Sequence, residues 1–239
     1  LVAGFIIGGT QPKKVIVRAI GPSLSAVGVA QPLADPTIEL YNAEGLVAWN
    51  DDWRSHQQTE IIASTVPPTN DKEAAIVAVL PANNAGYTAV VRGVHGGTGV
   101  GVVEVYDLEP SSGSRMVNIS TRGLVQTGQD VLIAGTIVLG PSPRKVIIRA
   151  LGPSLALPGA LADPTLELRD GNGVLLEEND DWMQSPNRQA IVDSTIPPSD
   201  SREAAIVWNL SGNNAPYTAV VRGFNETRGI AVVEVYALD

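Results

Sequence analysis

The chain has 239 residues, of which 44% are hydrophobic, and its formal net charge is −9. This length accommodates one or two domains, each with a core of its own. The absence of cysteine excludes disulfides, thiolate metal ligands and a cysteine nucleophile, and only two histidines are present. The acidic balance argues against nucleic acid as a partner, and no apolar run approaches the roughly 20 residues of a membrane span.

The predicted elements are short β-strands. In the first half, β-branched runs bounded by Gly, Pro, Asn or Asp occur at 15–20, 75–80, 87–92 and 100–106. In the last of these runs, outward and inward positions alternate as in a half-buried strand. The only helix-like stretches, 57–63 and 188–193, are too short to cover a parallel sheet. The pattern therefore predicts an all-β fold of antiparallel sheets packed face to face, with jelly-roll or Greek-key-like connections.

The second half of the chain repeats the first. KKVIVRAIGPSL from Lys13 returns as RKVIIRALGPSL from Arg144, and LADPTIEL from Leu33 returns as LADPTLEL from Leu161. The motifs NDDW, EAAIV, YTAVVRG and VVEVY also occur once in each half. Such self-similarity indicates tandem domains. We therefore predict two β-sandwich repeats, at 1–109 and 115–239, joined by a short linker at 110–114.

The second repeat carries an additional segment before its first matched strand. Leu1 aligns with Leu132, so Arg115–Asp130 (RMVNISTRGLVQTGQD) has no counterpart in the first repeat. If part of this segment is a strand, the first sandwich has an open edge. Either the chain is a piece of a longer array, or a neighbouring chain fills the edge by donor-strand complementation; the two interpretations are compatible. The candidate assembly strand consists of Met116, Val117, Asn118, Ile119, Ser120 and Thr121.

Two acidic turns are the candidate metal sites. They comprise Asn50, Asp51 and Asp52 in the first repeat, and Asn179, Asp180 and Asp181 in the second. Calcium binds six to eight oxygen ligands of these kinds, and it is the one cofactor that the sequence suggests. The alternative is turn chemistry, because Asn and Asp hydrogen-bond to nearby backbone.

No catalytic residues are predicted. Arg and Glu residues recur within the strands of both repeats, where cross-strand ion pairs explain them better than an acid–base pair. The serine of each GPSL motif has no histidine that is repeated with it. Trp53 and Trp182 follow the acidic turns, and either they close the sandwich core or they form exposed platforms that stack glycans.

The run DPTIELYNAEGLVAWNDDW, followed by YTAVVRG and VGVVEVYDL, resembles a bacterial pre-peptidase C-terminal (PPC-like) domain. The resemblance covers about 35–108 and 163–238, and the chain is also similar to tandem modules of large exported bacterial proteins. It implies a non-catalytic exported module that binds calcium or a polymer through its loops. By position, the acidic turns would supply Asp51, Asp52, Asp180 and Asp181.

The sequence thus predicts a non-catalytic extracellular structural protein, the repeat unit of a surface fibre, filament or adhesin stalk. In this hypothesis, subunits self-associate by β-strand exchange. The alternative is a polysaccharide- or polymer-binding accessory module of a larger secreted enzyme, for which exposed Trp53 and Trp182 are expected.

Overall fold

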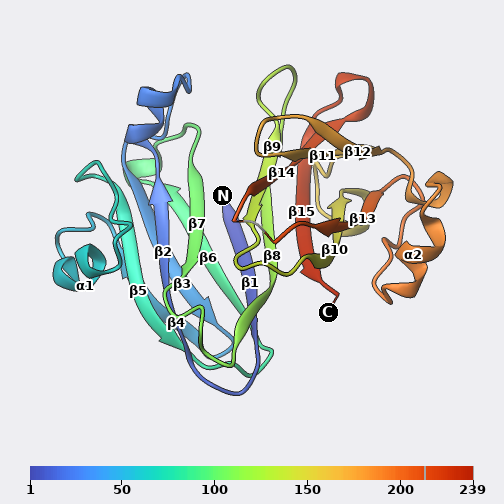
Figure 1. Ribbon diagram of the computed structural model, residues 1–239. Coiled ribbons are helices and arrows are strands. Elements are labelled where there is room, and N and C mark those ends of the chain that lie inside the picture. Colours follow the sequence, from blue (N-terminus) through green and yellow to red (C-terminus); the bar gives the residue numbers. More distant parts are fainter. Residues whose placement is uncertain (213, 239) are drawn as a thin grey trace. The chain divides into compact units, whose positions relative to one another are not determined.

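The computed structural model describes residues 1–212 and 214–238. The chain divides into two compact units, Leu1–Val117 (unit 1) and Asn118–Asp239 (unit 2). Each unit is an antiparallel β-sandwich, which confirms the predicted all-β fold class (Figure 1). The division falls within strand β8 (Arg115–Val125), three residues beyond the expected linker 110–114.

Unit 1 is built from two sheets. Its elements are β1 (Val2–Gly8), β2 (Lys13–Ile20), η1 (Pro22–Val27), β3 (Pro36–Asn42), β4 (Gly45–Asn50), α1 (Gln58–Ala63), β5 (Ala74–Leu80), β6 (Gly86–Gly93), η2 (Val94–Gly96) and β7 (Val102–Asp107). One sheet has the order β1-β6-β3-β4 and the other has the order β5-β2-β7. Apart from the β3–β4 hairpin, successive strands alternate between the sheets, as in a jelly roll.

Unit 2 repeats this arrangement and adds one strand. After β8 come β9 (Leu132–Ile137), β10 (Arg144–Leu151), η3 (Pro153–Leu155), β11 (Pro164–Asp170), β12 (Leu175–Asn179), η4 (Trp182–Gln184), α2 (Arg188–Asp193), β13 (Ala204–Leu210), β14 (Pro216–Gly223), η5 (Phe224–Glu226) and β15 (Gly229–Ala237). One sheet has the order β12-β11-β14-β9. In the other, β13-β10-β15 corresponds to β5-β2-β7, and β8 adds a strand beside β15.

The sheet that contains β2 is covered on both faces. Val15, Val17 and Ala19 point into the sandwich core, whereas Ile16 points outward. The outward face is closed by Trp53 and by residues of α1, including Ile61. Burial on both sides explains why β2 reads as a nearly continuous apolar run.

The tryptophans of the NDDW motifs belong to these outer layers. Trp53 is 3% exposed and Trp182 is 5% exposed. Each indole nitrogen donates to a backbone carbonyl, that of Asn70 at 3.1 Å in unit 1 and that of Asp200 at 3.0 Å in unit 2. The core-packing interpretation is therefore confirmed, and neither ring is available as a glycan platform.

The GPSL and EAAIV motifs meet at a buried glutamate. Glu73 is fully buried, and its Oε1 accepts hydrogen bonds from the backbone nitrogens of Gly21, at 3.2 Å, and Ser23, at 3.0 Å. The Ser23 hydroxyl donates to the same oxygen. A Cβ on Gly21 would lie 2.1 Å from the carbonyl oxygen of Leu33, so glycine is required there. Glu203 makes the same contacts in unit 2, and the motif is a structural joint.

Candidate functional site

The two repeats differ most at strand β7 and its counterpart β15. In unit 2, β15 lies between β10 and β8 and is paired on both sides. In unit 1, β7 pairs with β2, and the residues of this unit place no counterpart of β8 on its other side. The edge of β7 opposite β2, here called the open edge, is therefore the main structural asymmetry between the repeats.

The missing pairing shortens the strand. β15 runs for nine residues from Gly229, and its first three residues pair with Val125, Leu124 and Gly123 of β8. β7 runs for six residues and begins only at Val102, although Gly99–Gly101 match Gly229–Ala231 in the sequence. Of these three residues, Val100 forms only an isolated bridge with Pro32, and the partner strand that pairs with their counterparts is lacking. Strand length thus depends here on pairing as well as on local propensity.

The backbone groups at the open edge can be assigned from the ladder. The amide of Leu108 donates to the carbonyl of Lys14 at 3.0 Å, so the even-numbered residues of β7 direct their N–H groups toward β2. Because orientation alternates along an antiparallel strand, Val103 and Val105 direct their N–H and C=O groups away from β2. In unit 2, Asn118 Nδ2 donates to the carbonyl of Val235, the counterpart of Val105, at 3.2 Å. The open edge therefore presents the groups that β8 engages in unit 2.

The open edge also leaves part of the unit 1 core uncovered. Val233 and Val235 of β15 are 0% and 7% exposed, respectively. Their counterparts Val103 and Val105 are only partly buried, although both pack against the core of unit 1. The difference arises because β8 contributes the buried Val125 and the partly buried Ile119 to the core of unit 2. An extended strand at the open edge would bury apolar surface as well as pair backbone groups.

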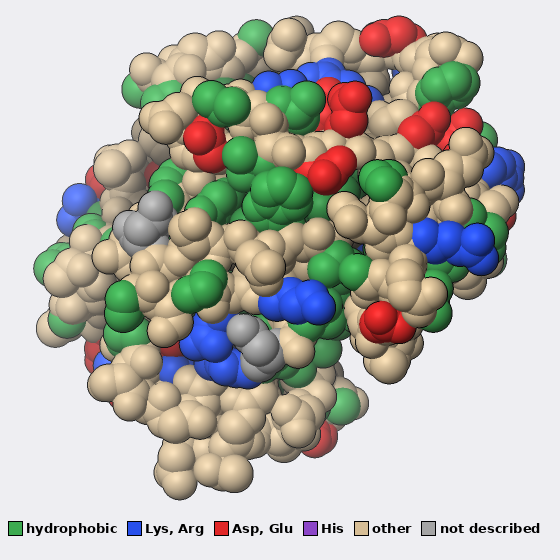
Figure 2. Space-filling model, turned by 45° about the vertical axis from the view of Figure 1, so that its right-hand side comes forward, with side chains coloured by type: hydrophobic (Ala, Val, Ile, Leu, Met, Phe, Trp, Pro, Cys, Tyr) green, Lys and Arg blue, Asp and Glu red, His purple; other side chains and the backbone are tan. Residues whose placement is uncertain are grey.

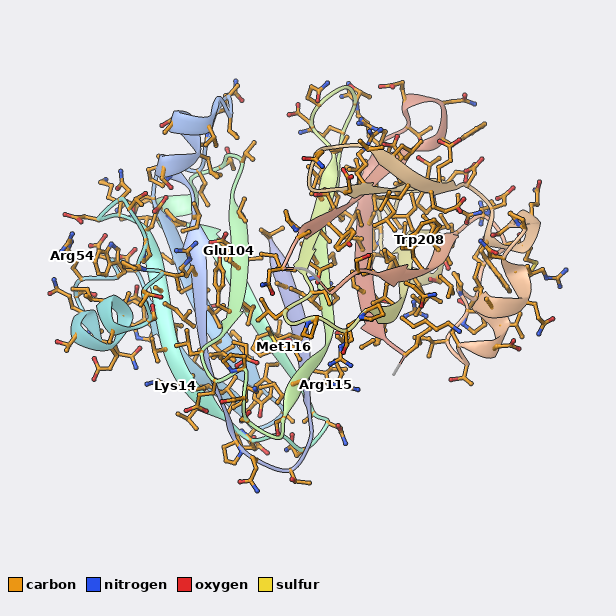
Figure 3. The ribbon with its side chains drawn as sticks, in the orientation of Figure 1. Lys14, Arg54, Glu104, Arg115, Met116 and Trp208 are labelled. Carbon is orange, nitrogen blue, oxygen red and sulfur yellow. The ribbon has the colours of Figure 1, made fainter. Side chains whose placement is uncertain are left out.

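The segment predicted as an assembly strand is a β-strand, and it is longer than expected because β8 ends at Val125 rather than at Thr121; its role in assembly stays a prediction. Its pairing with β15 runs from Asn118, opposite Tyr236, to Val125, opposite Gly229. Met116, which Figure 3 labels, and Val117 precede this register, and the division of the chain assigns both to unit 1. The residues that cover β15 are therefore Asn118–Val125.

The outward face of β7 carries a cross-strand ion pair. Arg18 Nε donates to Glu104 Oε2 at 2.9 Å, and these residues are directly opposite each other on β2 and β7. Figure 3 labels Glu104 on β7. Arg149 and Glu234 form the same pair in unit 2. The expectation of cross-strand ion pairs is confirmed.

The acidic turns form a second candidate site. In unit 1, carboxylate oxygens of Asp35, Asp51 and Asp52 lie within 4.8 Å of one another. Asp163, Asp180 and Asp181 form the same cluster in unit 2. In the described part of the chain, Oδ1 of Asp51, of Asp163 and of Asp180 is buried without a hydrogen-bond partner. All donors are oxygens, so the clusters fit a hard divalent cation such as calcium, which remains a prediction.

Burial and mutual repulsion shift the ionisation of these carboxyls. Burial raises the pKa of Asp51, and the charges of Asp52 and Asp35 raise it further. In unit 2, burial followed by the charges of Asp163 and Asp181 raises the pKa of Asp180. The charged forms are therefore disfavoured in the absence of a cation.

The predicted ligand sets need correction at their asparagines. Asn50 is 2% exposed, and its Oδ1 accepts the backbone N–H of Ala75 at 2.9 Å. Asn179 Oδ1 accepts the N–H of Ala205 at the same distance. Because these amide oxygens anchor strands β5 and β13, both asparagines are structural.

The third carboxylate of each cluster, Asp35 or Asp163, comes from a segment that sequence reasoning did not connect with the turn. A repeated LADPT motif was the available signal. Around the first cluster, an open pocket of about 540 Å³ also includes Arg54, Ser55, Asp71 and Lys72. Lys72 Nζ lies 3.2 Å from Asp35 Oδ2, which neutralises part of the negative charge.

Comparisons with known proteins give no family. No family model and no curated protein matches the chain. The crystal structure of the STIV MCP is similar with a TM-score of 0.27 and 11% identity, over 98% of this chain and 90% of that chain. The VP2 subviral particle of infectious bursal disease virus gives a TM-score of 0.23 and 9% identity, over 98% and 67%.

On the face shown in Figure 2, basic side chains lie in separate groups among acidic and apolar ones. No helix in the described part of the chain is long and apolar enough to cross a bilayer.

Proposed function

We propose that the chain is a non-catalytic structural module of an extracellular fibre or filament, and that modules associate by strand addition at the open edge of β7. The single observation that carries this proposal is the difference between β7 and β15. The same repeated strand is paired on both sides in unit 2 and on one side in unit 1. An unpaired edge beside a partly uncovered core is a ready acceptor for a strand from another chain.

The repeated polar residues support a structural role. The arginine and glutamate pairs, the buried glutamates and the asparagines each stabilise the sandwich in both units. The extracellular setting follows from the resemblance to exported PPC-like modules and is part of the proposal.

The test grafts a second copy of residues 115–131 directly ahead of Leu1, as these residues precede Leu132 in the natural chain. The graft supplies the missing strand in cis. We expect the unaltered chain to show concentration-dependent association by sedimentation velocity and elongated assemblies by negative-stain electron microscopy. The grafted chain is expected to stay monomeric, with a higher unfolding temperature for unit 1.

A matched graft with Ile119→Lys and Val125→Lys in the added copy separates strand insertion from mere lengthening of the chain. This control should leave association unchanged, because lysines at the two core positions prevent docking. A chain that remains monomeric at the highest attainable concentration would overturn the assembly proposal.

The alternative is a polysaccharide-binding accessory module. It required exposed rings of Trp53 and Trp182, and both rings are buried. Trp49 is 59% exposed, but Glu178 occupies its position in the second repeat. A glycan panel monitored by tryptophan fluorescence would favour this alternative if quenching were lost in Trp49→Ala.

A further inference from the structure

We propose that the partner at the open edge is an extended segment with the residue pattern of β8, docked antiparallel to β7 in the register that β8 adopts on β15. This inference rests on the proposed function and specifies the partner of the same site. The occupant is therefore a strand from another copy of this kind of repeat. What argues for it is the internal copy, in which the same acceptor strand is seen with its partner in place.

The register follows from the repeat. On β15, Val235 lies opposite Ile119 and Val233 lies opposite Thr121. Because Val105 and Val103 match Val235 and Val233, the incoming strand places its Ile119 equivalent opposite Val105 and its Thr121 equivalent opposite Val103. A slip by one residue would turn every core side chain to solvent, so a register of this kind is strongly specified.

The pattern of β8 fits the acceptor on both faces. Ile119, Thr121, Gly123 and Val125 share the inward face, and Val125 is fully buried in the core of unit 2. On the other face, Arg122 and Leu124 are exposed. A partner strand thus needs apolar residues at its two ends, small or β-branched residues between them, and solvent-compatible residues on the alternate face.

Each chain holds two acceptor strands, β7 and β15, but only one strand of the β8 pattern in its described residues. Moving β8 from β15 to β7 of another chain would fill one edge and open another. Such an exchange leaves the number of paired edges unchanged, so the unaltered chain assembles by exchange of β8 only at high concentration. A synthetic peptide supplies an additional donor strand and completes β7 without opening β15.

The probe is a fluorescently labelled peptide of residues 115–130, titrated into the full chain and followed by anisotropy. We expect saturable 1:1 binding. Binding should fall at least tenfold for Val103→Pro, which removes an N–H group from the open edge but leaves those that face β2. It should be unchanged for Val79→Ser, which alters a 63%-exposed valine on β5, the opposite edge strand of the same sheet.

Register is tested by thiol cross-linking, which is site-specific because the chain contains no cysteine. Val232 lies opposite Arg122 on β15, so Val102 in the chain should face position 122 of the peptide. The even positions of β7 form non-hydrogen-bonded pairs at the open edge, where Cα atoms are about 4.5 Å apart and a disulfide can form. Val102→Cys should therefore cross-link to the Arg122→Cys peptide at least five times faster than to Ser120→Cys or Leu124→Cys peptides.

The outcomes distinguish this inference from the proposed function. Binding with the expected cross-link, in a chain that never forms assemblies, would uphold the partner and its register and overturn the fibre. Assemblies that Val103→Pro abolishes, together with absent peptide binding or a faster cross-link at position 120 or 124, would uphold strand-edge assembly and overturn the inferred partner. Peptide binding that survives Val103→Pro would also overturn the inference.

Discussion

Glu73 and Glu203 show how a single buried side chain joins distant parts of each repeat. Each carboxylate receives the backbone N–H groups of a GPSL turn, and both residues are fully buried. Replacing Glu73 with Gln keeps one acceptor oxygen for the GPSL turn but places an amide nitrogen against the backbone N–H of Asn70, which Oε2 accepts at 3.3 Å. We expect a loss of about 1–3 kcal/mol in the free energy of unfolding, measured by urea denaturation. Glu60→Gln on α1, at an exposed position, should change it little.

The acidic clusters predict an unusual response to pH. Because burial and neighbouring carboxylates raise the pKa of Asp51, folding favours its protonated form. A carboxyl whose pKa is higher in the folded state than in the unfolded state stabilises the fold at pH values below its unfolded-state pKa of about 3.9. That stabilisation is lost as the pH rises through the folded-state pKa. In EDTA, Asp51→Asn should therefore raise the unfolding temperature at pH 7 and have little effect at pH 3. Calorimetry at both pH values measures the unfolding temperatures. A change in unfolding temperature on Asp51→Asn that is equal at pH 7 and at pH 3 would contradict the argument from charge.

Calcium provides a separate test of the same residues. If the carboxylates bind the cation, millimolar calcium raises the unfolding temperature of the unaltered chain, since a ligand of the folded state stabilises it. We expect the shift to disappear in the double variant Asp51→Asn, Asp180→Asn and to persist in Asn42→Ala, a turn variant outside the clusters. An unaltered chain that does not respond to calcium would leave turn chemistry as the explanation.

At the scale of elements, β7 and β15 form a natural matched pair. The amides of Val103 and Val105 face the open edge, whereas those of Val233 and Val235 face β8. Hydrogen exchange measured by NMR should therefore be fast for Val103 and Val105, and slower by at least tenfold for Val233 and Val235. Equal protection in the isolated chain would mean that something already covers β7.

Much of the strand pattern could be predicted because β-branched runs end at Gly, Pro, Asn or Asp and because each motif occurs twice. The far end of β8 was not predictable from its residues, since Arg122, Gly123 and Leu124 join the strand through pairing with β15. The contribution of Asp35 to the acidic cluster could not be predicted for a similar reason. The sequence shows only which residues are neighbours along the chain, and it is the fold that brings Asp35 close to Asp51. The roles of Asn50 and Asn179 likewise depend on where β5 and β13 begin.

At the scale of the whole molecule, the repeats have one sandwich architecture with unequal completeness. Unit 2 includes Val125 in its core, and unit 1 leaves Val103 and Val105 only partly buried. We expect the peptide of residues 115–130 to raise the unfolding temperature of unit 1 by roughly 4–8 °C for each kcal/mol of binding free energy. Two single-tryptophan chains, both with Trp49→Phe and Trp208→Phe, one also with Trp182→Phe and the other also with Trp53→Phe, would let Trp53 and Trp182 report on the two units separately. A shift confined to the Trp182 signal would contradict the assignment of the acceptor to unit 1.

The shortened β7 has a directional consequence. An acceptor that takes a strand in one orientation and one register cannot be matched with itself by the same contact, so the interface is heterologous. Modules joined in this way would face the same direction along a polymer. At one tip the open edge of β7 would have no partner strand, and at the other tip β8 would not be paired with a neighbouring module. Growth and capping at the two tips would then be chemically different processes, and a short peptide that occupies the acceptor would stop elongation at one tip while leaving the other active.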